Sequence, residues 1–195
     1  MRKYGLVLLA AGPAPSNGRN KKLPPYNHQT LLKQSLQIAL ESTAAQTVVV
    51  TGANAQLVKK ELITSDAYTV YNSEWRDGIA SSIKCGLSAL IKVQPDVDAA
   101  LFMVCDQPYI TTHLLNSLMS RSSRENKIAA SICNNTLGTP AAFPERYFPE
   151  LLDLSGDEGA KKVLKHYAKQ IALIPFNNGY IDIDTPIDYE SLMAN

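Results

Sequence analysis

The sequence predicts an α/β fold, a three-layer α/β/α sandwich around a mostly parallel sheet. Two observations carry this prediction. Short apolar or β-branched runs alternate along the chain with stretches in which apolar residues recur at helical intervals. The runs are also nearly continuous, as in strands that helices cover on both faces. With 195 residues, 45% of them hydrophobic, the chain can bury a sizeable core. We therefore expect one domain over residues 1–195.

The predicted strands and helices take turns in chain order. The strands follow the apolar runs at 4–10, 47–52, 68–72, 99–105 and 128–133. The helices lie between them, at 30–42, 55–63, 78–91 and 111–125. Because strand and helix alternate, parallel strands joined by crossover helices are the simplest arrangement.

The pattern loosens in the last third of the chain. Five stretches there predict shorter strands: 136–143, 145–154, 158–168, 170–176 and 179–184. The tripeptide "NNG" at 177–179 predicts a turn. In "YIDIDTP", Asp182 and Asp184 alternate with isoleucines, which predicts two carboxylates on one face of a strand, while Thr185 and Pro186 are also typical of a helix start. We expect this part to complete the sheet and to cover a substrate.

Charge and cysteine content exclude several functional classes. Lys and Arg number 19 against 18 Asp and Glu, so the balance favours neither a nucleic acid nor an anionic membrane as an obligatory partner. The apolar run 6–11 is too short for a signal-peptide core or a membrane span, and we expect a cytoplasmic protein. Cys85, Cys105 and Cys133 are widely spaced and form no CxxC, which indicates reduced thiols.

The segment after the first predicted strand has the composition of a phosphate-binding loop. In open α/β sheets, ligands bind beyond the carboxyl ends of the strands. The small residues 10–12 ("AAG") let a ligand approach the backbone, and "PAPSNGRNKK" at 13–22 adds Gly18, Arg19 and Lys21. An ordinary basic surface loop is the alternative. The segment is neither a Walker A loop nor a GxGxxG turn.

The tetrapeptide "CDQP" at 105–108 places a carboxylate directly after another predicted strand. Asp106 is therefore a candidate ligand for Mg²⁺, which prefers oxygen donors and often bridges carboxylates to substrate phosphates. A simple turn aspartate is the alternative.

The stretch "SEWRDGIASSIKCGL" begins at Ser73 and leads into the predicted helix 78–91. It sets glycine and serine side chains near the start of that helix, a place suited to hydrogen bonding with a sugar or base. The residues concerned are Trp75, Gly78, Ser81, Ser82 and Gly86. A glycine-rich helix start without a ligand is the alternative.

Taken in order, the motifs resemble those of the MobA-like nucleotidyltransferases, most closely the molybdenum cofactor cytidylyltransferase branch. The matching pieces are "LAAG" with "G..K" at 9–21, "W..G..SS...GL" at 75–87, "CDQP" at 105–108, "G.P..F" at 138–143, "L.GD.GA" at 154–160 and "DIDTP.DY" at 182–189. The resemblance implies a Rossmann-like sheet of the nucleotide-diphospho-sugar transferase type.

The resemblance also implies an activity. Members of this branch transfer a nucleotidyl group from an NTP, here CTP, to the terminal phosphate of molybdopterin or of the molybdenum cofactor, with Mg²⁺ as cofactor and release of pyrophosphate. A molybdenum enzyme or its maturation factor would then be a further partner.

Site residues follow from the matched positions. The nucleotide would contact Ala10, Ala11, Gly12, Gly18, Lys21, Ser82 and Asp106. Lys21 and Asp106 would be catalytic, and Asp106 and Asp184 would hold the metal. The acceptor side would consist of Gly138, Pro140, Gly156, Asp157, Gly159 and Lys161.

The phosphate loop departs from the family pattern LAAGxSxRMGxxKxLL. Ser16 stands at the place of the arginine, and Pro13 and Pro15 remove two backbone N–H donors. Arg19 lies three positions further on and is a candidate to replace the arginine at the phosphates. Two alternatives stay open: a nucleotide- or pterin-binding module without catalysis that assists a molybdenum enzyme, and a transferase for another small phosphate.

Overall fold

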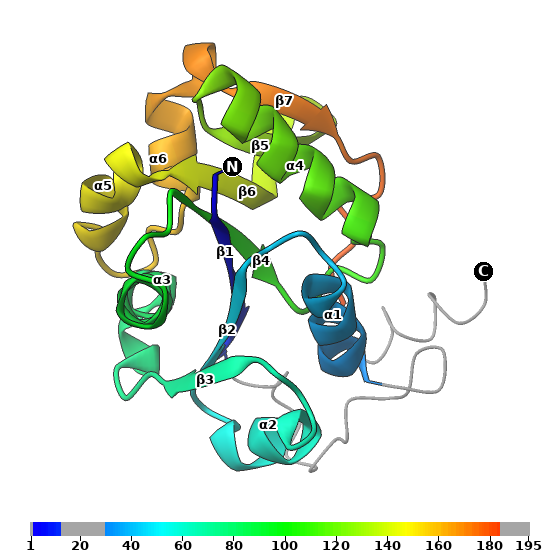
Figure 1. Ribbon diagram of the computed structural model, residues 1–195, viewed down its shortest axis with the longest axis vertical. Coiled ribbons are helices and arrows are strands. Elements are labelled where there is room, and N and C mark those ends of the chain that lie inside the picture. Colours follow the sequence, from blue (N-terminus) through cyan, green and yellow to red (C-terminus); the bar gives the residue numbers. More distant parts are fainter. Residues whose placement is uncertain (1, 13–29, 184–195) are drawn as a thin grey trace.

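The computed structural model describes residues 2–12 and 30–183, which contain a seven-stranded sheet (Figure 1). Its strands are β1 (Tyr4–Ala10), β2 (Gln46–Thr51), β3 (Tyr68–Tyr71), β4 (Ala99–Val104), β5 (Ala129–Cys133), β6 (Thr136–Pro144) and β7 (Ala172–Pro175), in the spatial order β3-β2-β1-β4-β6-β5-β7. Strands β3, β2, β1 and β4 pair in parallel, and so do β5 and β7. Strand β6 is antiparallel to both of its neighbours. The mostly parallel sheet is confirmed.

Helices cover both faces of this sheet. They are α1 (Leu31–Leu40), α2 (Ala55–Leu62), α3 (Ile79–Val93), α4 (Thr112–Glu125), α5 (Phe148–Leu152) and α6 (Lys161–His166), with 3₁₀ turns at Trp75–Asp77, Glu145–Tyr147 and Ala168–Gln170. Threonine side chains cap two of the helices. Thr30 accepts a hydrogen bond from the backbone N–H of Lys33 at 3.1 Å, and Thr111 accepts one from Leu114 at 3.1 Å. Each cap satisfies one of the unpaired N–H groups of a first helical turn.

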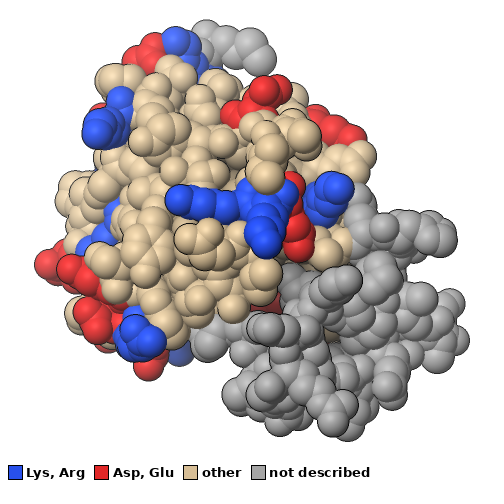
Figure 2. Space-filling view, turned by 90° about the horizontal axis from the view of Figure 1, so that it is seen from below, with Lys and Arg blue, Asp and Glu red and all other residues tan. Residues whose placement is uncertain are grey.

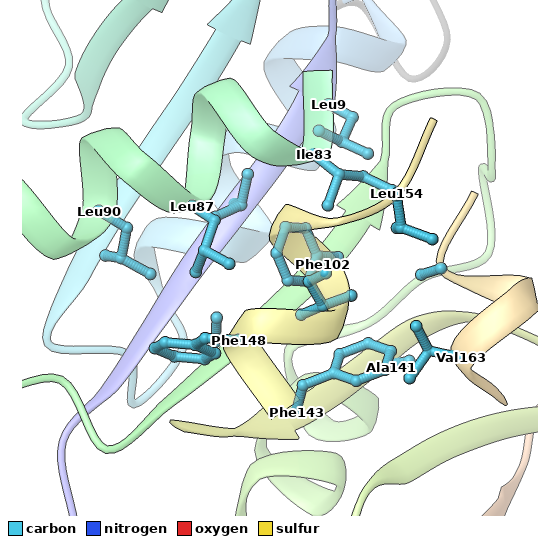
Figure 3. Packing of buried hydrophobic residues seen from close by; sticks show 14 of the residues in the cluster. Leu9, Ile83, Leu87, Leu90, Phe102, Ala141, Phe143, Phe148, Leu154 and Val163 are labelled. Atoms are coloured by element: carbon cyan, nitrogen blue, oxygen red, sulfur yellow. The ribbon is translucent and has the colours of Figure 1, made fainter. Parts of the chain in front are cut away.

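The alternation of side chains along β1 creates two cores. Leu6 and Leu8 point to the face covered by α1, α2 and α4, whereas Val7 and Leu9 point to the face covered by α3, α5 and α6. We call the second of these the α3-side core. Figure 3 shows Leu87 of α3 in this core near Phe102 of β4 and Phe148 of α5. Two buried faces on one sheet establish the three layers that the sequence predicts.

The elements predicted in the first two thirds of the chain are confirmed. Each observed strand or helix begins and ends within two residues of its predicted bounds. The 136–143 and 170–176 strands are also present, as β6 and β7. The local apolar period was a reliable signal wherever the element was long or fully buried.

Three of the predictions for the last third are wrong. Residues 145–154 and 158–168 carry α5 and α6 instead of strands, because their buried residues, such as Phe148 and Leu151, follow a helical spacing. The predicted strand 179–184 is absent from its described part, 179–183. The turn at 177–179 is confirmed, since the N–H of Gly179 donates to the carbonyl of Phe176 at 2.9 Å. Asp184, Thr185 and Pro186 lie outside the described residues.

The described surface carries charges of both signs. On the face drawn in Figure 2, Lys and Arg side chains lie next to Asp and Glu among a larger uncharged area. This mixture agrees with the formal net charge of +1. Over residues 2–12 and 30–183, no helix has the length and apolar character needed to cross a bilayer.

Gly86 allows α3 to lie directly on the sheet. A Cβ at this position would lie 2.7 Å from a Cγ of Val50 on β2 and would also collide with Val7 on β1. The structure thus gives Gly86 a packing role beneath the helix.

We predict that Gly86→Ala destabilises the protein although alanine is the better helix former. The substitution gains about 1 kcal/mol in helix propensity. Overpacking costs about 1–3 kcal/mol, and the stiff valine side chains leave little room for relief. Urea unfolding should therefore show a loss of free energy of unfolding. Ser88→Ala, on the exposed side of the same helix, is the control and should change stability by no more than about 0.5 kcal/mol. A Gly86→Ala protein as stable as the wild type would contradict this packing.

Candidate functional site

A cavity of about 550 Å³ opens at the carboxyl ends of β1, β4 and β5. Its walls come from the end of β4, the β5–β6 turn, the start of α6 and the segment that follows β7. In a sheet of this kind, the carboxyl edge of the parallel strands is where ligands bind. The cavity is therefore the candidate site.

The floor of the cavity is apolar and shared with the α3-side core. Leu9, Ile83 and Phe102 line the cavity and are at most 8% exposed. Phe176 and Tyr180 add two aromatic side chains, and Tyr180 is 64% exposed. A rigid apolar floor with aromatic walls suits the flat ring of a ligand.

Charged side chains line the same cavity. They are the carboxylates of Asp106, Asp157 and Asp182 and the ammonium group of Lys161. Carboxylates therefore outnumber ammonium groups in the described lining. A phosphate ligand would be repelled unless a cation accompanied it.

The segment 179–183 reaches this site through hydrogen bonds to the end of β4. The N–H of Ile183 donates to the carbonyl of Asp106 at 2.9 Å. The side-chain amide of Gln107 donates to the carbonyl of Gly179 at 3.2 Å. These two bonds bring Asp182 into the cavity that Asp106 lines.

The donor set of the cavity fits Mg²⁺ bound together with a substrate. Within the described ranges, no group of three or more His, Cys, Asp or Glu residues is arranged as a metal site. Asp106 and Asp182 nevertheless offer carboxylate oxygens in one cavity. Mg²⁺ commonly binds one or two carboxylates and completes its shell with substrate phosphates and water. Both residues could hold the ion in this way.

The structure brings most of the predicted acceptor residues together. Gly138, Asp157, Gly159 and Lys161 line the cavity along with Asp106. The other two predicted acceptor residues, Pro140 and Gly156, are not part of the lining. The carbonyl of Pro140 accepts a hydrogen bond from the Ser131 hydroxyl at 2.9 Å, and that of Gly156 accepts one from the N–H of Ala80 at 3.1 Å. Their roles toward an acceptor stay predictions.

The predicted nucleotide residues are described only in part. Ala10 and Ala11 are buried at the end of β1, and the Ala11 carbonyl accepts a hydrogen bond from the N–H of Ala53 at 3.1 Å. Gly12 is exposed, and no described atom lies within 4 Å of a Cβ built on it. The remaining loop and metal candidates, Gly18, Arg19, Lys21 and Asp184, lie outside the described residues.

A buried polar network holds the start of α3. The side-chain amide of Asn72 donates to the hydroxyl oxygens of Ser81 at 2.8 Å and Ser82 at 3.0 Å. The Ser81 hydroxyl lies within hydrogen-bond distance of the carbonyls of Glu74, at 2.7 Å, and Gly78, at 2.8 Å. All three side chains of the network are buried. The contact of Ser82 with a nucleoside stays a prediction, because the structure gives its hydroxyl a protein partner.

A second, smaller hollow adjoins this network. It is a groove of about 270 Å³ at the end of β3, lined among others by Asn72, Glu74, Ser81 and Lys84. Ser82 is not part of its lining. The groove and the main cavity share no lining residue, so a nucleoside contact in the groove stays a prediction.

Among the residues of the main cavity that sequence reasoning did not assign to the site are Gln107, Phe176 and Tyr180. Gln107 is buried in its wall, and its Oε1 has no hydrogen-bond partner among the described residues. Its place in the matched motif "CDQP", directly after Asp106, was the available signal. Phe176 and Tyr180 were missed because they were assigned to two predicted strands, 170–176 and 179–184, and were given no role at the site.

All three cysteines are unpaired, as the sequence predicts. Burial, and to a lesser degree the charge of Asp106, raises the pKa of the Cys105 thiol to about 12. Burial followed by the charge of Glu74 also raises the pKa of the Cys85 thiol. Both thiols are therefore protonated at neutral pH and are poor nucleophiles.

We predict that Cys105 resists alkylation in the folded protein. With a pKa of about 12, only about one thiol in ten thousand is ionised at pH 8. Iodoacetamide should label Cys105 at least about a hundredfold more slowly in the native protein than in urea, as followed by peptide mass spectrometry. Labelling at equal rates in both states would refute the assigned environment.

Comparisons with known proteins agree with this arrangement. The family model of the MobA-like NTP transferase domain matches residues 6–171. The nicotine blue oxidoreductase of Paenarthrobacter nicotinovorans is 29% identical, over 92% of this chain and 91% of that protein. The purine catabolism protein PucB of Bacillus subtilis is 25% identical, over 94% and 93%. The crystal structure of Rv0371c from Mycobacterium tuberculosis superposes with a TM-score of 0.84 at 26% identity, covering 100% of this chain and 99% of the other. The same protein has also been solved as a manganese complex.

Proposed function

Since the chain belongs to the MobA-like NTP transferase domain family, we propose that it is a Mg²⁺-dependent nucleotidyltransferase. It transfers CMP from CTP to the terminal phosphate of molybdopterin or of the molybdenum cofactor and releases pyrophosphate. The nucleotidyltransferase class follows from the family. The choice of nucleotide, metal and acceptor is the proposal.

One observation carries the proposal: four predicted acceptor residues and the predicted metal ligand line a single cavity. Asp106 follows β4, Gly138 lies in β6, and Asp157 and Lys161 flank the start of α6. These segments are far apart in the sequence. Their convergence is what a site for an acceptor next to a metal-bound triphosphate requires.

The reaction needs little covalent chemistry from the protein. An oxygen of the acceptor phosphate attacks the α-phosphorus of CTP, and the bond to pyrophosphate breaks, with pyrophosphate leaving with the electron pair. The chain's own residues hold the two reactants in line. Lys161 meets the acceptor phosphate, and the apolar floor formed by Leu9, Ile83 and Phe102 receives the ring.

A bound Mg²⁺ ion would supply positive charge at the reacting phosphates. Asp106 and Asp182 are the described residues that would hold it. The manganese complex of Rv0371c supports a divalent ion in this fold. The excess of carboxylates among the described lining residues also supports it, because a divalent cation offsets their repulsion of the substrate phosphates.

The test is pyrophosphate release from CTP and purified molybdopterin. Asp106→Asn should reduce turnover by at least about a hundredfold, because the amide cannot replace a charged metal ligand. Asp96→Asn is the matched control: Asp96 lies near the opposite end of β4, where it pairs with Lys3. Thermal unfolding should show both variants folded. Full activity of Asp106→Asn would reject the metal assignment.

A second prediction concerns the acceptor and uses two adjacent lysines. Lys161→Ala should raise the KM for molybdopterin by about tenfold or more, because a charged hydrogen bond to phosphate is lost. Lys162→Ala should leave it unchanged, since Lys162 does not line the cavity and bonds instead to Glu158 at 2.7 Å. Equal effects of the two substitutions would point to general surface charge rather than to a phosphate contact.

Two alternatives have support of their own. The phosphate loop carries Ser16 where the family has arginine, which favours a binding module with weak or no turnover. A redox function is suggested by the name of one relative, nicotine blue oxidoreductase. Nucleotide binding without pyrophosphate release would favour the first, and oxidation or reduction of a substrate by the purified protein would favour the second. Transfer to a different small phosphate would retain the reaction and change only the acceptor.

A further inference from the structure

The loop 155–160 carries Asp157 and leads into Lys161, and it is fixed at both ends. Leu154 is 3% exposed and Ala160 is 5% exposed, and both belong to the α3-side core. Figure 3 shows Leu154 close to Ile83 of α3. Residues 155–158 between these anchors are exposed. The position of residues 155–158 relative to the cavity therefore depends on the residues that the loop contacts between its two buried ends.

The start of α3 lies beneath it and contacts the loop at three successive residues. The N–H of Ala80 donates to the carbonyl of Gly156 at 3.1 Å. A Cβ built on Gly159 would lie 3.3 Å from Cγ2 of Ile79. A Cβ built on Gly78 would collide with the backbone of Gly156 and lie 2.6 Å from Oδ1 of Asp157. The loop and the helix start thus meet backbone to backbone.

The conformation of Gly78 makes this approach specific for glycine. Its φ of 90° and ψ of 175° fall in a region that side chains exclude. Gly78 precedes α3 and offers no side-chain cap, so the carbonyl of Gly156 satisfies the N–H of Ala80 instead. The loop therefore caps the N-terminus of α3, and α3 in turn supports the loop; we call this support the seating of the loop.

The same helix start supports the groove at the end of β3. Asn72 and Ser81 line the groove, and the Ser81 hydroxyl lies 2.8 Å from the carbonyl of Gly78. One short segment thus has the groove on one side and the loop with Asp157 on the other.

We propose that Gly78 is a positioning residue for the acceptor: it sets the place of Asp157 and Lys161 by allowing the loop 155–160 to rest on α3. The proposal builds on the proposed function, because only that function assigns the loop to an acceptor phosphate. Gly78 touches no substrate itself. The heavy atoms nearest to a Cβ built on Gly78 belong to Gly156 and Asp157 of the loop and not to the groove. The effect of a side chain at this position should therefore appear in the binding of the acceptor and not in the binding of the nucleotide.

The first test is steady-state kinetics of Gly78→Ala with CTP, Mg²⁺ and purified molybdopterin. The new methyl group pushes the loop away, so the KM for molybdopterin should rise by about tenfold or more, while the KM for CTP stays within about twofold. Asn126→Ala is the matched control. Asn126 also has a positive φ, of 50°, but lies at the C-terminus of α4. It should lose stability without changing either KM.

The second test is hydrogen exchange, which needs no turnover. Gly78→Ala should speed amide exchange in residues 155–161 by at least about tenfold relative to the wild type, whereas Asn126→Ala should not. If Gly78→Ala yields too little folded protein, Gly159→Ala applies a milder push on the same contact from the loop side and should speed exchange in the same residues.

The outcomes separate this inference from the proposed function. Unchanged exchange in the loop overturns the seating, and faster exchange with an unchanged KM for molybdopterin overturns the positioning role. An equal rise in both KM values also overturns it, because the effect would then be general. A wild-type protein without transferase activity rejects the proposed function and the positioning role together, while exchange still decides whether Gly78 seats the loop.

Discussion

The burial of β1 on both faces is the constraint on which the other layers depend. Leu6 and Leu8 must face one core and Val7 and Leu9 the other, so the strand can lie only inside the sheet. Its pairing with β4, in which Leu9 lies opposite Val104, brings the ends of both strands to one edge. Ala11 and Gly12 after β1 and Asp106 after β4 consequently lie at the same edge of the sheet. The position of the site is thus a result of strand register rather than of any one functional residue.

The fold could be predicted from the sequence wherever burial left a local period. Strands β1 to β5 and the first four helices are long or apolar enough for that signal. Helices α5 and α6 contain only five and six residues, so the helical spacing of their buried residues extends over less than two turns and is a weak signal. The segment 179–183 was mistaken for a strand because its path is set by distant partners, Asp106 and Gln107, which the local pattern does not contain.

The residues of the candidate site also differ in whether a local sequence signal marks them. Asp106 was recognisable because it directly follows a strand, and Asp157 and Lys161 because they stand in matched motifs. Tyr180 neither follows a strand directly nor belongs to a matched motif, since it reaches the cavity only through the turn after β7. Two glycines show most plainly that the sequence alone does not reveal why a residue is needed at its position. Gly78 and Gly86 stand eight positions apart in one motif. The first is required by its backbone angles and a neighbouring loop, the second by two valines beneath the helix.

The residues that form the floor of the cavity are also part of the hydrophobic core. Leu9, Ile83 and Phe102 face the ligand space and at the same time fill the α3-side core. A smaller residue at any of them would enlarge the pocket, but it would also leave a void in the interior, which costs about 2–5 kcal/mol for a large aliphatic or aromatic side chain. Native proteins have only about 5–15 kcal/mol of stability in total. New ligand preferences in this scaffold should therefore evolve, or be engineered, through the exposed residues 155–158 and the β5–β6 turn, where the sequence can change while the interior stays intact.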